Sequence, residues 1–571
     1  MSDDVKQVVL TIDVGSSSIK CGAYEIIEDT NVQQLDNCFL SLSIRTVEPN
    51  TGKIELISKE EGNSLFDDID GLIDAMLDRL RTYPKELNVR GIGFSTFCMN
   101  LLALDQLGNP LGKDATISYA CSTDAVRNEC AILKSSFGED SSQQQQIYQR
   151  TGAPIHSSYA LPQLRVFYKD PKNLDLISQI SVWQTIASVC ISRWRGVRFS
   201  PISFSEASWT GMFNFRTLEW DDEVISLISE NFPKHLPPLC DYADDVAPLG
   251  GIRQHGLEKG GEQDERNPYC DRWPELSECR IFYGLGDGAC ANVGSGCWTS
   301  QNIAVTIGTS AAARVCIPWS PRDCGETFDV PKGLFCYRLD RSHLILGGAL
   351  TDGGSMIEWA RSLLNLQDDD SFNRCLIQVE ELLTEDYQRC LQDGFITSDI
   401  TLLPFLSGER SVGYRDDARF CISGLTRTST TAHFMKACMM GIVLRLECIL
   451  KLLFQKTEIG SHMQSIVASG SALEKNVLWR QMLADCCGVS VELLNSIQEN
   501  TSFGLGIMLS VALSMEQDNI SSSTSYFKQD LQYVPSIRST PNKPMHDAYW
   551  LPALENQEKL IQAILPTGMN N

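Results

Sequence analysis

The sequence lacks several features that would place it in a familiar class of protein. No apolar stretch approaches the ~20 residues that a membrane-spanning helix needs, because the longest one, residues 433–454, is interrupted by Lys and Arg and by one Glu. No Gly-x-x-x-x-Gly-Lys-Ser/Thr, His-Glu-x-x-His or Cys-x-x-Cys pattern occurs. These absences argue against a P-loop nucleotide site, a zinc protease and a zinc or disulfide framework. The N-terminus has no apolar signal core, so we expect a protein of the reducing cytoplasm.

Positive charge is also scarce. The 571 residues include 48 Lys and Arg against 72 Asp and Glu, which gives a net charge of −24. Such a surface repels phosphate backbones, so we expect neither a nucleic-acid nor a membrane partner. A small anionic ligand is not excluded, because helix ends and local cations override the overall field. The oligomeric state is open at this stage, with a homodimer as one option.

Two glycine turns repeat almost the same phrase far apart in the chain. VVLTIDVGSSSIKCGAYE (residues 8–25) returns as NIAVTIGTSAAARVCIPW (residues 302–319), and a third turn follows a strand at Gly470. Each turn alone is typical of an ordinary hairpin. Together they predict concavities of backbone N–H groups that bind phosphate. A nucleotide triphosphate held between two halves of the chain explains all three turns.

Charged residues beside these turns suggest the chemistry. Asp13 precedes the first turn, where a carboxylate near phosphate needs a cation such as Mg²⁺ between them; an Asx turn is the simpler alternative. Lys20 could reach a phosphate or lie in solvent. Asp287 begins a helix of small residues and is either an N-cap or the base that positions a substrate hydroxyl in phosphoryl transfer. The dinucleotide fingerprint around Asp287 lacks the acidic residue ~20 positions later, so we reject a dehydrogenase.

Alternating strand and helix patterns predict an α/β fold with two halves and a cleft between them. We expect an amphipathic helix over residues 65–81, a strand over residues 91–95, and a long buried-face helix over residues 433–454. The glutamine tract of residues 141–152 is interpreted as a loop or a helix start, and residues 251–268 as a surface insertion. Residues 405–425 mix charges of both signs, which usually indicates a solvated loop.

These motifs, taken in order, resemble the FGGY carbohydrate kinases. The resemblance covers nearly the whole chain and includes TIDVGSSSIKCG, YQRTGAPIHSSYALPQL, SFSEASWTGMFNFRTLEW, GLGDGACANVGSG, VTIGTSAAARV, LGGALTDGGSMIEW, FLSGERSVGYRDDARFCISGL and IVASGSALEKNVLWRQMLADCCG. The segments around residues 206–211, 286–297 and 405–411 are most similar to the gluconokinase branch. The resemblance implies two ribonuclease-H-like domains of the actin/hexokinase type, over residues 5–296 and 297–517, followed by a partly irregular tail over residues 518–571.

The resemblance also implies roles for individual residues. Asp287 corresponds to the catalytic aspartate, and Asp13 to the residue that holds the metal. The implied ATP and phosphate contacts are Asp13, Gly15, Ser16, Ser17, Ser18 and Lys20 in the first turn, Gly308, Thr309 and Ser310 in the second, and Gly470, Ser471 and Ala472 in the third. The implied cofactors are ATP and Mg²⁺.

The sugar-binding region departs from the family pattern. Met99, Asn100, Tyr119, Cys121 and Asp287 occupy the positions expected to bind the substrate. Cys121 stands where the family usually has Asp, and Thr123 stands where it has Arg. Asp352 also replaces a usual Asn. The missing Arg would be the natural partner of a sugar-acid carboxylate, although Arg127 is near enough in sequence to replace it.

The sequence therefore predicts an ATP-dependent kinase of a sugar or sugar acid, with gluconate the leading substrate. Three alternatives remain at this point. One is a kinase of another sugar or polyol, such as xylulose or ribulose. Another is a nucleotide-binding sensor that has lost sugar phosphorylation. An actin- or Hsp70-like structural ATPase is the third, and the motifs of residues 284–296 and 405–414 argue against it.

Overall fold

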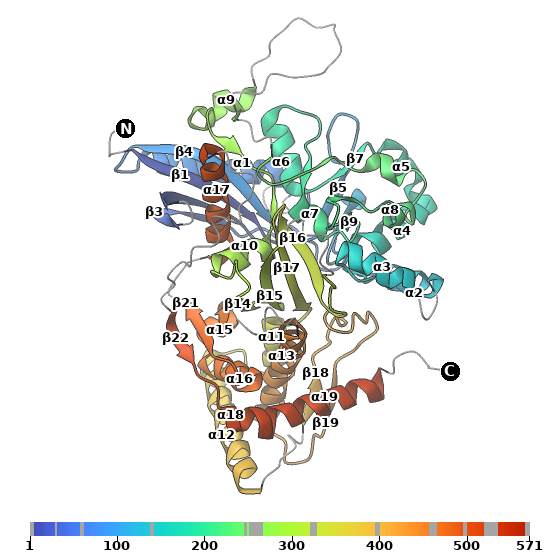
Figure 1. The fold of residues 1–571 in the computed structure, drawn as a ribbon, viewed down its shortest axis with the longest axis vertical. Coiled ribbons are helices and arrows are strands. Elements are labelled where there is room, and N and C mark those ends of the chain that lie inside the picture. Colours follow the sequence, from blue (N-terminus) through green and yellow to red (C-terminus); the bar gives the residue numbers. More distant parts are fainter. Residues whose placement is uncertain are drawn as a thin grey trace, which may run out of the picture.

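Two mixed β-sheets, each with its own helices, form the framework of the computed structural model (Figure 1). The structure describes residues 5–28, 31–57, 62–137, 142–244, 248–249, 267–319, 328–393, 400–455, 465–494, 499–518 and 535–565. Most of the predicted surface insertion, over residues 251–266, lies outside these ranges. The two sheets agree with the α/β fold expected from the alternating pattern.

The first sheet has the order β12-β4-β1-β2-β3, and β13 pairs with β4 beyond this path. Strand β2 is antiparallel to both of its neighbours, β1 and β3, whereas β4 runs parallel to β1 and to β12 and β13. The strands are β1 (Lys6–Val14), β2 (Ile19–Glu28), β3 (Asn31–Leu42), β4 (Leu87–Thr96), β12 (Arg280–Ile281) and β13 (Leu285–Gly286). The strand expected at residues 91–95 is the buried part of β4.

The second sheet repeats the centre of the first. Its order is β16-β17-β15-β14-β20-β21-β22. An antiparallel hairpin, β14 with β15, again lies beside a parallel neighbour, here β20. The strands are β14 (Asn302–Ile307), β15 (Ala311–Pro318), β16 (Phe335–Asp340), β17 (His343–Leu350), β20 (Ser465–Ser469), β21 (Val491–Leu494) and β22 (Pro535–Ser539). The repeated glycine turns therefore join equivalent strands of two similar sheets.

The strongest helical patterns in the sequence are helices in the structure. Helix α1 (Leu65–Arg81) has the predicted bounds, with the Ser64 hydroxyl accepting the backbone N–H of Asp67 as its N-cap. The predicted buried-face helix is α13 (Thr431–Phe454). The glutamine tract is α3 (Ser142–Thr151), with Ile147 and Tyr148 buried. Periodicity was sufficient to locate the first two helices, whereas the polar sequence of the third left its type open.

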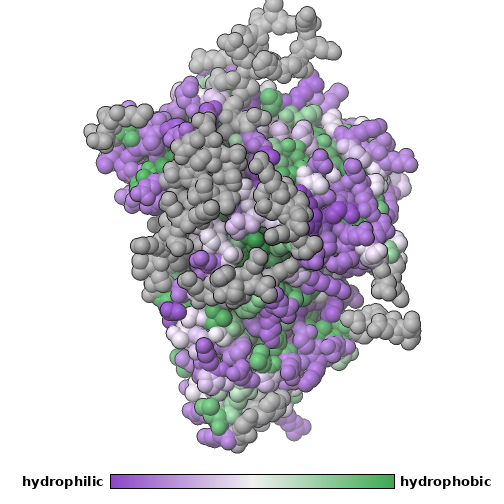
Figure 2. All heavy atoms as spheres, viewed as in Figure 1, coloured by the Kyte–Doolittle hydropathy of each residue, from purple (hydrophilic) through white to green (hydrophobic). Residues whose placement is uncertain are grey.

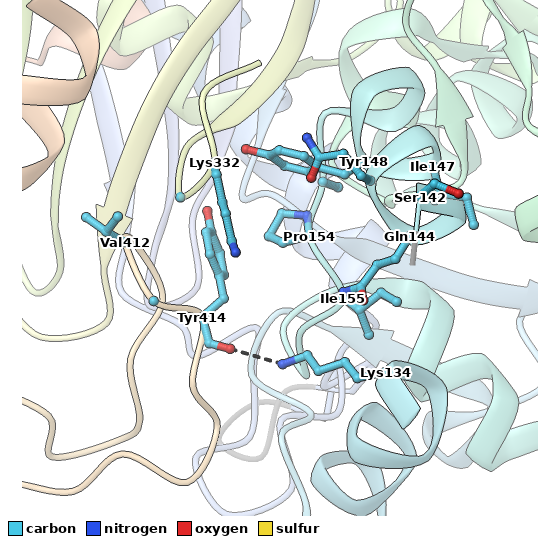
Figure 3. Close-up of a pocket in the computed structure, with 14 residues that line it drawn as sticks. Lys134, Ser142, Gln144, Ile147, Tyr148, Pro154, Ile155, Lys332, Val412 and Tyr414 are labelled. Atoms are coloured by element: carbon cyan, nitrogen blue, oxygen red, sulfur yellow. Dashed lines mark hydrogen bonds between the residues drawn. The ribbon is translucent and has the colours of Figure 1, made fainter. Parts of the chain in front are cut away.

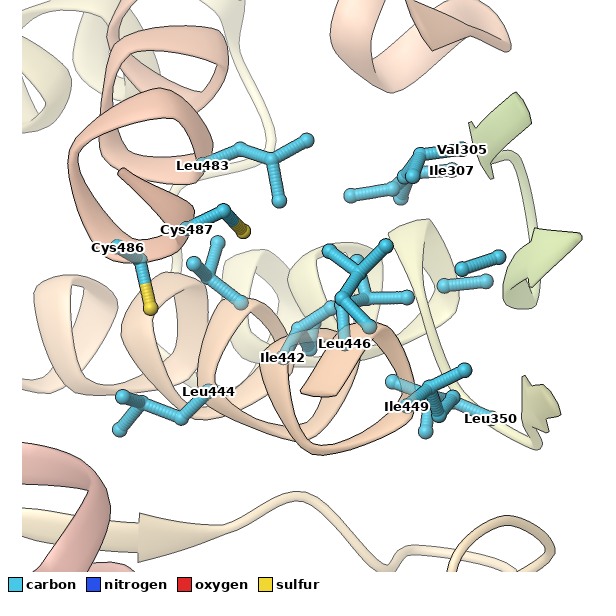
Figure 4. Close-up of a cluster of buried hydrophobic side chains, with 14 of the residues drawn as sticks. Val305, Ile307, Leu350, Ile442, Leu444, Leu446, Ile449, Leu483, Cys486 and Cys487 are labelled. Atoms are coloured by element: carbon cyan, nitrogen blue, oxygen red, sulfur yellow. The ribbon is translucent and has the colours of Figure 1, made fainter. Parts of the chain in front are cut away.

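The core of the second half forms where α13 packs against the sheet. Figure 4 shows Val305 and Ile307 of β14 directed toward Ile442 and Leu446 of α13, with Leu483 of α16 (Val477–Cys487) alongside. All five side chains are fully buried. Burial of each such side chain stabilises the fold by about 1.5–3 kcal/mol. This core fixes the strand edge that carries the second glycine turn.

One helix crosses from the second half to the first. Helix α17 (Asn500–Asp518), drawn in red in Figure 1, packs on β1, β2, β3 and β4 and on α10 (Asp287–Gly294). Its contact with α10 is very close, because a Cβ added to Gly504 would lie 1.9 Å from the carbonyl oxygen of Cys290. The segment that ends the second half in sequence thus belongs in space to the sheet of the first half.

The C-terminal segment is more regular than its composition indicates. Strand β22 pairs with β21, and α19 (Leu551–Ile564) packs beside β18 (Thr401–Leu403) with Ile561 buried. Residues 519–534 and 566–571 lie outside the described ranges. The remaining helices with at least five residues are α2 (Asp124–Ser136), α4 (Ala160–Lys169), α5 (Leu174–Gln179), α6 (Ile186–Arg195), α7 (Phe204–Ser208), α8 (Asp222–Ser226), α9 (Pro268–Arg272), α11 (Gly354–Leu363), α12 (Asp369–Asp393) and α15 (Ser471–Lys475).

The surface is largely hydrophilic on the face that Figure 2 presents, as the high content of acidic residues leads one to expect. Hydrophobic residues appear there in small separate patches. Among the helices that the structure describes, none is both long and apolar enough to cross a bilayer.

Candidate active site

The candidate active site begins at the carboxyl ends of three neighbouring parallel strands in the first sheet. Asp13 of β1 is level with Ser95 of β4, and Gly286 of β13 is level with Thr96 of β4. Asp287 follows directly. Parallel strands end at the same edge of a sheet, which is where α/β folds bind ligands. The fold therefore places the two carboxylates that the sequence singled out along one edge.

Asp13 lies in a network of three charges. Lys20, its partner across the hairpin, donates to Asp13 Oδ2 at 3.1 Å and to Glu499 Oε1 at 3.3 Å. Burial and, to a lesser extent, the carboxylate of Glu499 raise the pKa of Asp13 to about 7, and the charge of Lys20 opposes this rise. Glu499 has no counterpart in the sequence predictions. Glu499 lies at this site because it immediately precedes α17, the helix that packs against this sheet.

The second oxygen of Asp13 has a different environment. Asp13 Oδ1 is buried and has no hydrogen-bond partner among the described residues. A buried carboxylate oxygen without a partner costs about 1–3 kcal/mol, and a hard cation such as Mg²⁺ is a suitable partner for it. The residues present thus fit a magnesium ion held through Asp13. No cluster of three or more potential metal ligands occurs in the described ranges, so water and phosphate would supply the other ligands.

The first glycine turn is fixed by backbone hydrogen bonds. The N–H of Gly15 donates to Ser18 O at 2.9 Å, and the hydroxyl of Thr46 donates to Gly15 O at 2.7 Å. Ser17 is exposed at the tip, and Gly15, Ser16 and Ser18 are half-buried. The turn therefore presents small polar groups at the strand edge beside Asp13 and Lys20.

The second and third turns lie against each other at the equivalent edge of the second sheet. Gly470 has φ of 90°, and a Cβ at this position would lie 2.4 Å from Ile307 O, at the end of β14. The N–H of Gly354 donates to Gly308 O at 2.7 Å, and the N–H of Gly353 donates to Thr309 O at 2.9 Å. Only glycine allows so close an approach of three chain segments. Gly308, Thr309, Ser310, Gly470, Ser471 and Ala472 are consequently gathered around the ends of two adjacent strands.

Asp287 occupies the first position of α10. Its Oδ1 accepts the N–H of Gly288 at 2.6 Å and faces the thiol of Cys98 at 3.4 Å. Burial raises its pKa, whereas the guanidinium of Arg314 and the N–H of Gly288 act against this rise. The N-cap of α10 is Gly286, so the N-cap interpretation of Asp287 is wrong, although its carboxylate still bonds to an N–H of the first turn. The role of Asp287 as the base stays a prediction. At neutral pH the nearby cation favours the ionised form, which can accept a proton.

Arg314 of β15 was not among the predicted residues. Its guanidinium lies flat against Gly288, because a Cβ added there would be 3.1 Å from Arg314 Nε, Cζ and Nη2. Its stem passes Gly347 of β17, where an added Cβ would be 3.0 Å from Arg314 Cγ. Glycines on two sides thus leave the space that this side chain fills. The signal in the sequence was a single charge within the apolar strand AAARVCI.

Unlike Asp287, three of the predicted sugar-binding residues, Met99, Asn100 and Tyr119, have side chains engaged in contacts within the protein. All of the hydrogen-bonding groups of the Asn100 amide are engaged within the protein: Nδ2 donates to Thr96 Oγ1 and Phe97 O, and Oδ1 accepts the N–H of Ile186. Met99 is packed in a core cluster. Tyr119 packs edge-on against Phe97, with their ring centroids 6.0 Å apart. The contacts of Asn100 fix the start of α6 and leave its amide no free N–H.

The positions that depart from the family pattern are also engaged locally. Cys121 is buried, and burial raises the pKa of its thiol. Thr123 caps α2 by accepting the N–H of Val126. Arg127 bonds to Ser122 and to Asp124 Oδ1 at 2.6 Å. Asp352 Oδ1 accepts the Ser355 hydroxyl at 3.1 Å. Arg127 is therefore held at the start of its own helix, and its replacement of the missing arginine stays a prediction.

Three further groups near Asp287 were missed. The indole Nε1 of Trp209 is buried without a partner among the described residues, and it lies 3.3 Å from a Cβ position on Gly286. The hydroxyls of Tyr159 and Tyr337 bond to each other at 2.7 Å. Arg410 lies among these tyrosines and Tyr414, and its positive charge acts to lower the pKa of the Cys98 thiol. Trp209 lies in the SEASWTG motif and Arg410 in the GERS motif. Because these motifs are far apart in the sequence, nothing in it indicated that both residues lie near Asp287.

A cavity of about 480 Å³ lies beside Tyr414, between residues 134–155 of the first half and residues 332–333 and 412–414 of the second (Figure 3). Lys134 Nζ bonds to Tyr414 O at 3.1 Å across it, and Lys332 extends into the same space. Tyr414 and Ala153 line the cavity and also pack in one cluster with Tyr159 and Tyr337. The cavity therefore borders the tyrosines of this cluster.

Comparisons with known proteins agree with this arrangement. Residues 8–249 match the N-terminal domain of the FGGY family of carbohydrate kinases, and residues 304–513 match its C-terminal domain. Gluconokinase of Bacillus subtilis is 26% identical over 71% of this chain and 71% of its own length. Xylulose kinase of Staphylococcus epidermidis is 24% identical over 99% of this chain and all of its own. The crystal structure of gluconate kinase from Lactobacillus acidophilus superposes with a TM-score of 0.74 at 20% identity, covering 98% of this chain and 99% of that one.

The chain belongs to the FGGY family of carbohydrate kinases. It has the two-domain ATPase fold that the resemblance implied. It is accordingly a sugar kinase, which transfers a phosphate group from ATP to an alcohol. The acceptor is not fixed by this membership, because the relatives named above differ in their substrates.

Proposed function

We propose that this kinase phosphorylates a hydroxyl group of a sugar acid, with gluconate as the leading substrate. The observation that carries the proposal is the position of Arg314, whose guanidinium lies against Gly288, next to the carboxylate of Asp287. A cation at this place suits an acceptor that carries a carboxylate. Similarity to a gluconokinase supports the same substrate, although it does so at only 26% identity.

The proposed mechanism depends on position more than on the strength of the base. Asp287 would accept the proton of the reacting hydroxyl. In a loose phosphoryl-transfer transition state the base needs to do little more than orient that hydroxyl. Lys20 would exchange its contact with Glu499 for the transferred phosphate. The glycine turns would hold the nucleotide through backbone N–H groups. When bound, Mg²⁺ would neutralise charge on the phosphates, and Asp13 Oδ1, which has no hydrogen-bond partner among the described residues, would face it.

The first test measures ADP release on gluconate, xylulose, ribulose and glycerol, with wild type and Asp287→Asn. We expect the wild type to have its highest kcat/KM on gluconate, and Asp287→Asn to lower kcat at least about 1000-fold while ADP binding persists. A matched control is Asp417→Asn, which alters an exposed carboxylate of the 405–425 loop and should keep wild-type rates.

Each other outcome contradicts a definite part of the proposal. Preference for xylulose, ribulose or glycerol would replace the sugar acid with a neutral acceptor. Nucleotide binding without turnover on any of the four would favour a sensor that no longer phosphorylates sugar. Normal turnover of Asp287→Asn would remove Asp287 from the chemistry.

A further inference from the structure

We infer that Arg314 and Arg410 together form the carboxylate-binding end of the acceptor site and make this kinase selective for sugar acids over neutral polyols. The inference rests on the proposed function and deepens it, because it names the residues that would recognise the acid. Both arginines come from the second half of the chain, whereas Asp287 comes from the first. The substrate would therefore connect the two halves through its charge.

Both guanidinium groups are available. In the ranges that the structure describes, Arg314 has neither a hydrogen bond nor an ion pair, and Arg410 Nε is buried without a hydrogen-bond partner. Both side chains are half-buried, and a guanidinium group partly withdrawn from water without an acceptor is costly. An anionic ligand would supply the acceptor to both.

One neighbouring acid is already paired with other cations. Glu409, next to Arg410 in sequence, accepts Arg445 Nη2 at 2.8 Å and lies 3.6 Å from Arg415 Nη1. Asp416 Oδ1 accepts the N–H of Ser157 at 3.3 Å and lies 3.2 Å from His156 Nε2, an imidazole that is neutral because burial lowers its pKa to about 4. These contacts also show that the 405–425 loop is not simply solvated, because Glu409 is 2% exposed. The pairing of Glu409 with Arg445 directs that carboxylate away from Arg410 and leaves Arg410 for a ligand.

The two arginines lie in one group of side chains. The positive charges of Arg314 and Arg410 both act on the thiol of Cys98, which is 3.4 Å from Asp287 Oδ1, and they also act on each other. Two like charges so close repel, and a carboxylate between them would relieve this repulsion. Trp209 Nε1, which has no hydrogen-bond partner in the part of the chain that the structure describes, adds a third donor near Gly286. A site rich in donors and poor in acceptors is suited to a carboxylate and to hydroxyl oxygens.

The test compares gluconate with D-glucitol, which has the same carbon chain without the carboxylate. Arg410→Leu removes the guanidinium group and keeps an apolar stem. We expect it to raise KM for gluconate about 30-fold or more, in line with the loss of a charge-assisted bond, and to change KM for D-glucitol less than about 3-fold. Arg314→Met should likewise raise KM for gluconate relative to KM for D-glucitol. Arg419→Leu is the matched control, since Arg419 is exposed in the same loop and bonds only to backbone oxygens among the described residues.

Calorimetric binding separates failure of this inference from failure of the proposed function. Calorimetry on the ADP complex of wild type and Arg410→Leu, with each ligand, measures recognition without turnover. Wild-type preference for gluconate that Arg410→Leu abolishes supports the inference, even if gluconate is not phosphorylated and the proposed substrate is therefore wrong. Equal losses for gluconate and D-glucitol, or no loss, overturn the inference even if gluconate is the best substrate. An unchanged ADP affinity in each variant excludes misfolding as the cause.

Discussion

At the scale of single residues, Glu206 is a buried acid close to Gly284, three positions before Asp287. Its side chain fits where Gly284 has none, because a Cβ on Gly284 would lie 2.6 Å from Glu206 Cδ. Thr96 donates to Glu206 Oε1 at 3.4 Å, whereas Oε2 is buried and without a partner among the described residues. Burial raises the pKa of Glu206 to about 7. The carboxyl group is therefore protonated in the folded protein at a pH where the unfolded chain has lost the proton.

The pKa of Glu206 predicts a pH-dependent stability. The folded state binds more protons than the unfolded state between the usual pKa of 4.5 and about 7, so the free energy of unfolding decreases as pH rises through this interval. Glu206→Gln mimics the protonated form and removes this decrease. Relative to wild type, we expect the variant to gain up to about 3 kcal/mol between pH 5 and pH 8. Urea unfolding of both proteins at pH 5 and pH 8 measures this gain. An equal difference in the free energy of unfolding at the two pH values would contradict the raised pKa of Glu206.

The residue scale also shows what the sequence could and could not predict. Asp13 and Asp287 were predicted from local features, because Asp13 ends an apolar strand pattern, Asp287 follows one, and each precedes or begins a glycine-rich segment. Arg314 and Arg410 are 96 positions apart, and only the packing of β15 and the 405–425 loop around Asp287 brings them together. Asn100 was expected to contact the sugar because of its position in a motif. Its bonds within the protein depend on α6, which no local pattern revealed.

At the scale of secondary structure, the contact between α10 and α17 determines where Asp287 lies. Gly294 and Gly504 face the backbone of the opposite helix, and a Cβ on either would lie 1.9 Å from a carbonyl oxygen. Backbone atoms cannot move aside as a side-chain tip does, so the helices would have to separate. The sequence predicted α17 as an element but placed it with the second half. Its glycines indicate close packing without naming the partner.

Gly504→Ala tests this contact. We expect it to lower the free energy of unfolding by at least about 2 kcal/mol and to reduce kcat, because α10 carries Asp287 at its first position. Gly71→Ala in α1 is the matched control, since an added Cβ there meets nothing within 4 Å. It should stabilise by about 0.5–1 kcal/mol through helix propensity. Equal effects of the two substitutions would show that the α10–α17 packing is not tight.

At the scale of the whole molecule, each ligand would touch both halves. The nucleotide would contact the turn at Gly15 in the first sheet and the turns at Gly308 and Gly470 in the second. The acid would contact Asp287 in the first half and Arg314 in the second. Two ligands that each favour the same relative position of the halves must strengthen each other's binding, and by the same factor.

This reciprocity gives a quantitative prediction for the proposed acid kinase. With ADP present, we expect the Kd for gluconate to fall about 5- to 50-fold, and gluconate should lower the Kd for ADP by the same factor. D-Glucitol, which has no carboxylate for Arg314 and Arg410, should produce a smaller change. Titration calorimetry in both orders measures the two factors. Independent binding of ADP and gluconate would mean that the arginines recognise the acid without drawing the halves together, because a ligand shifts a conformational equilibrium only by its difference in affinity for the two states.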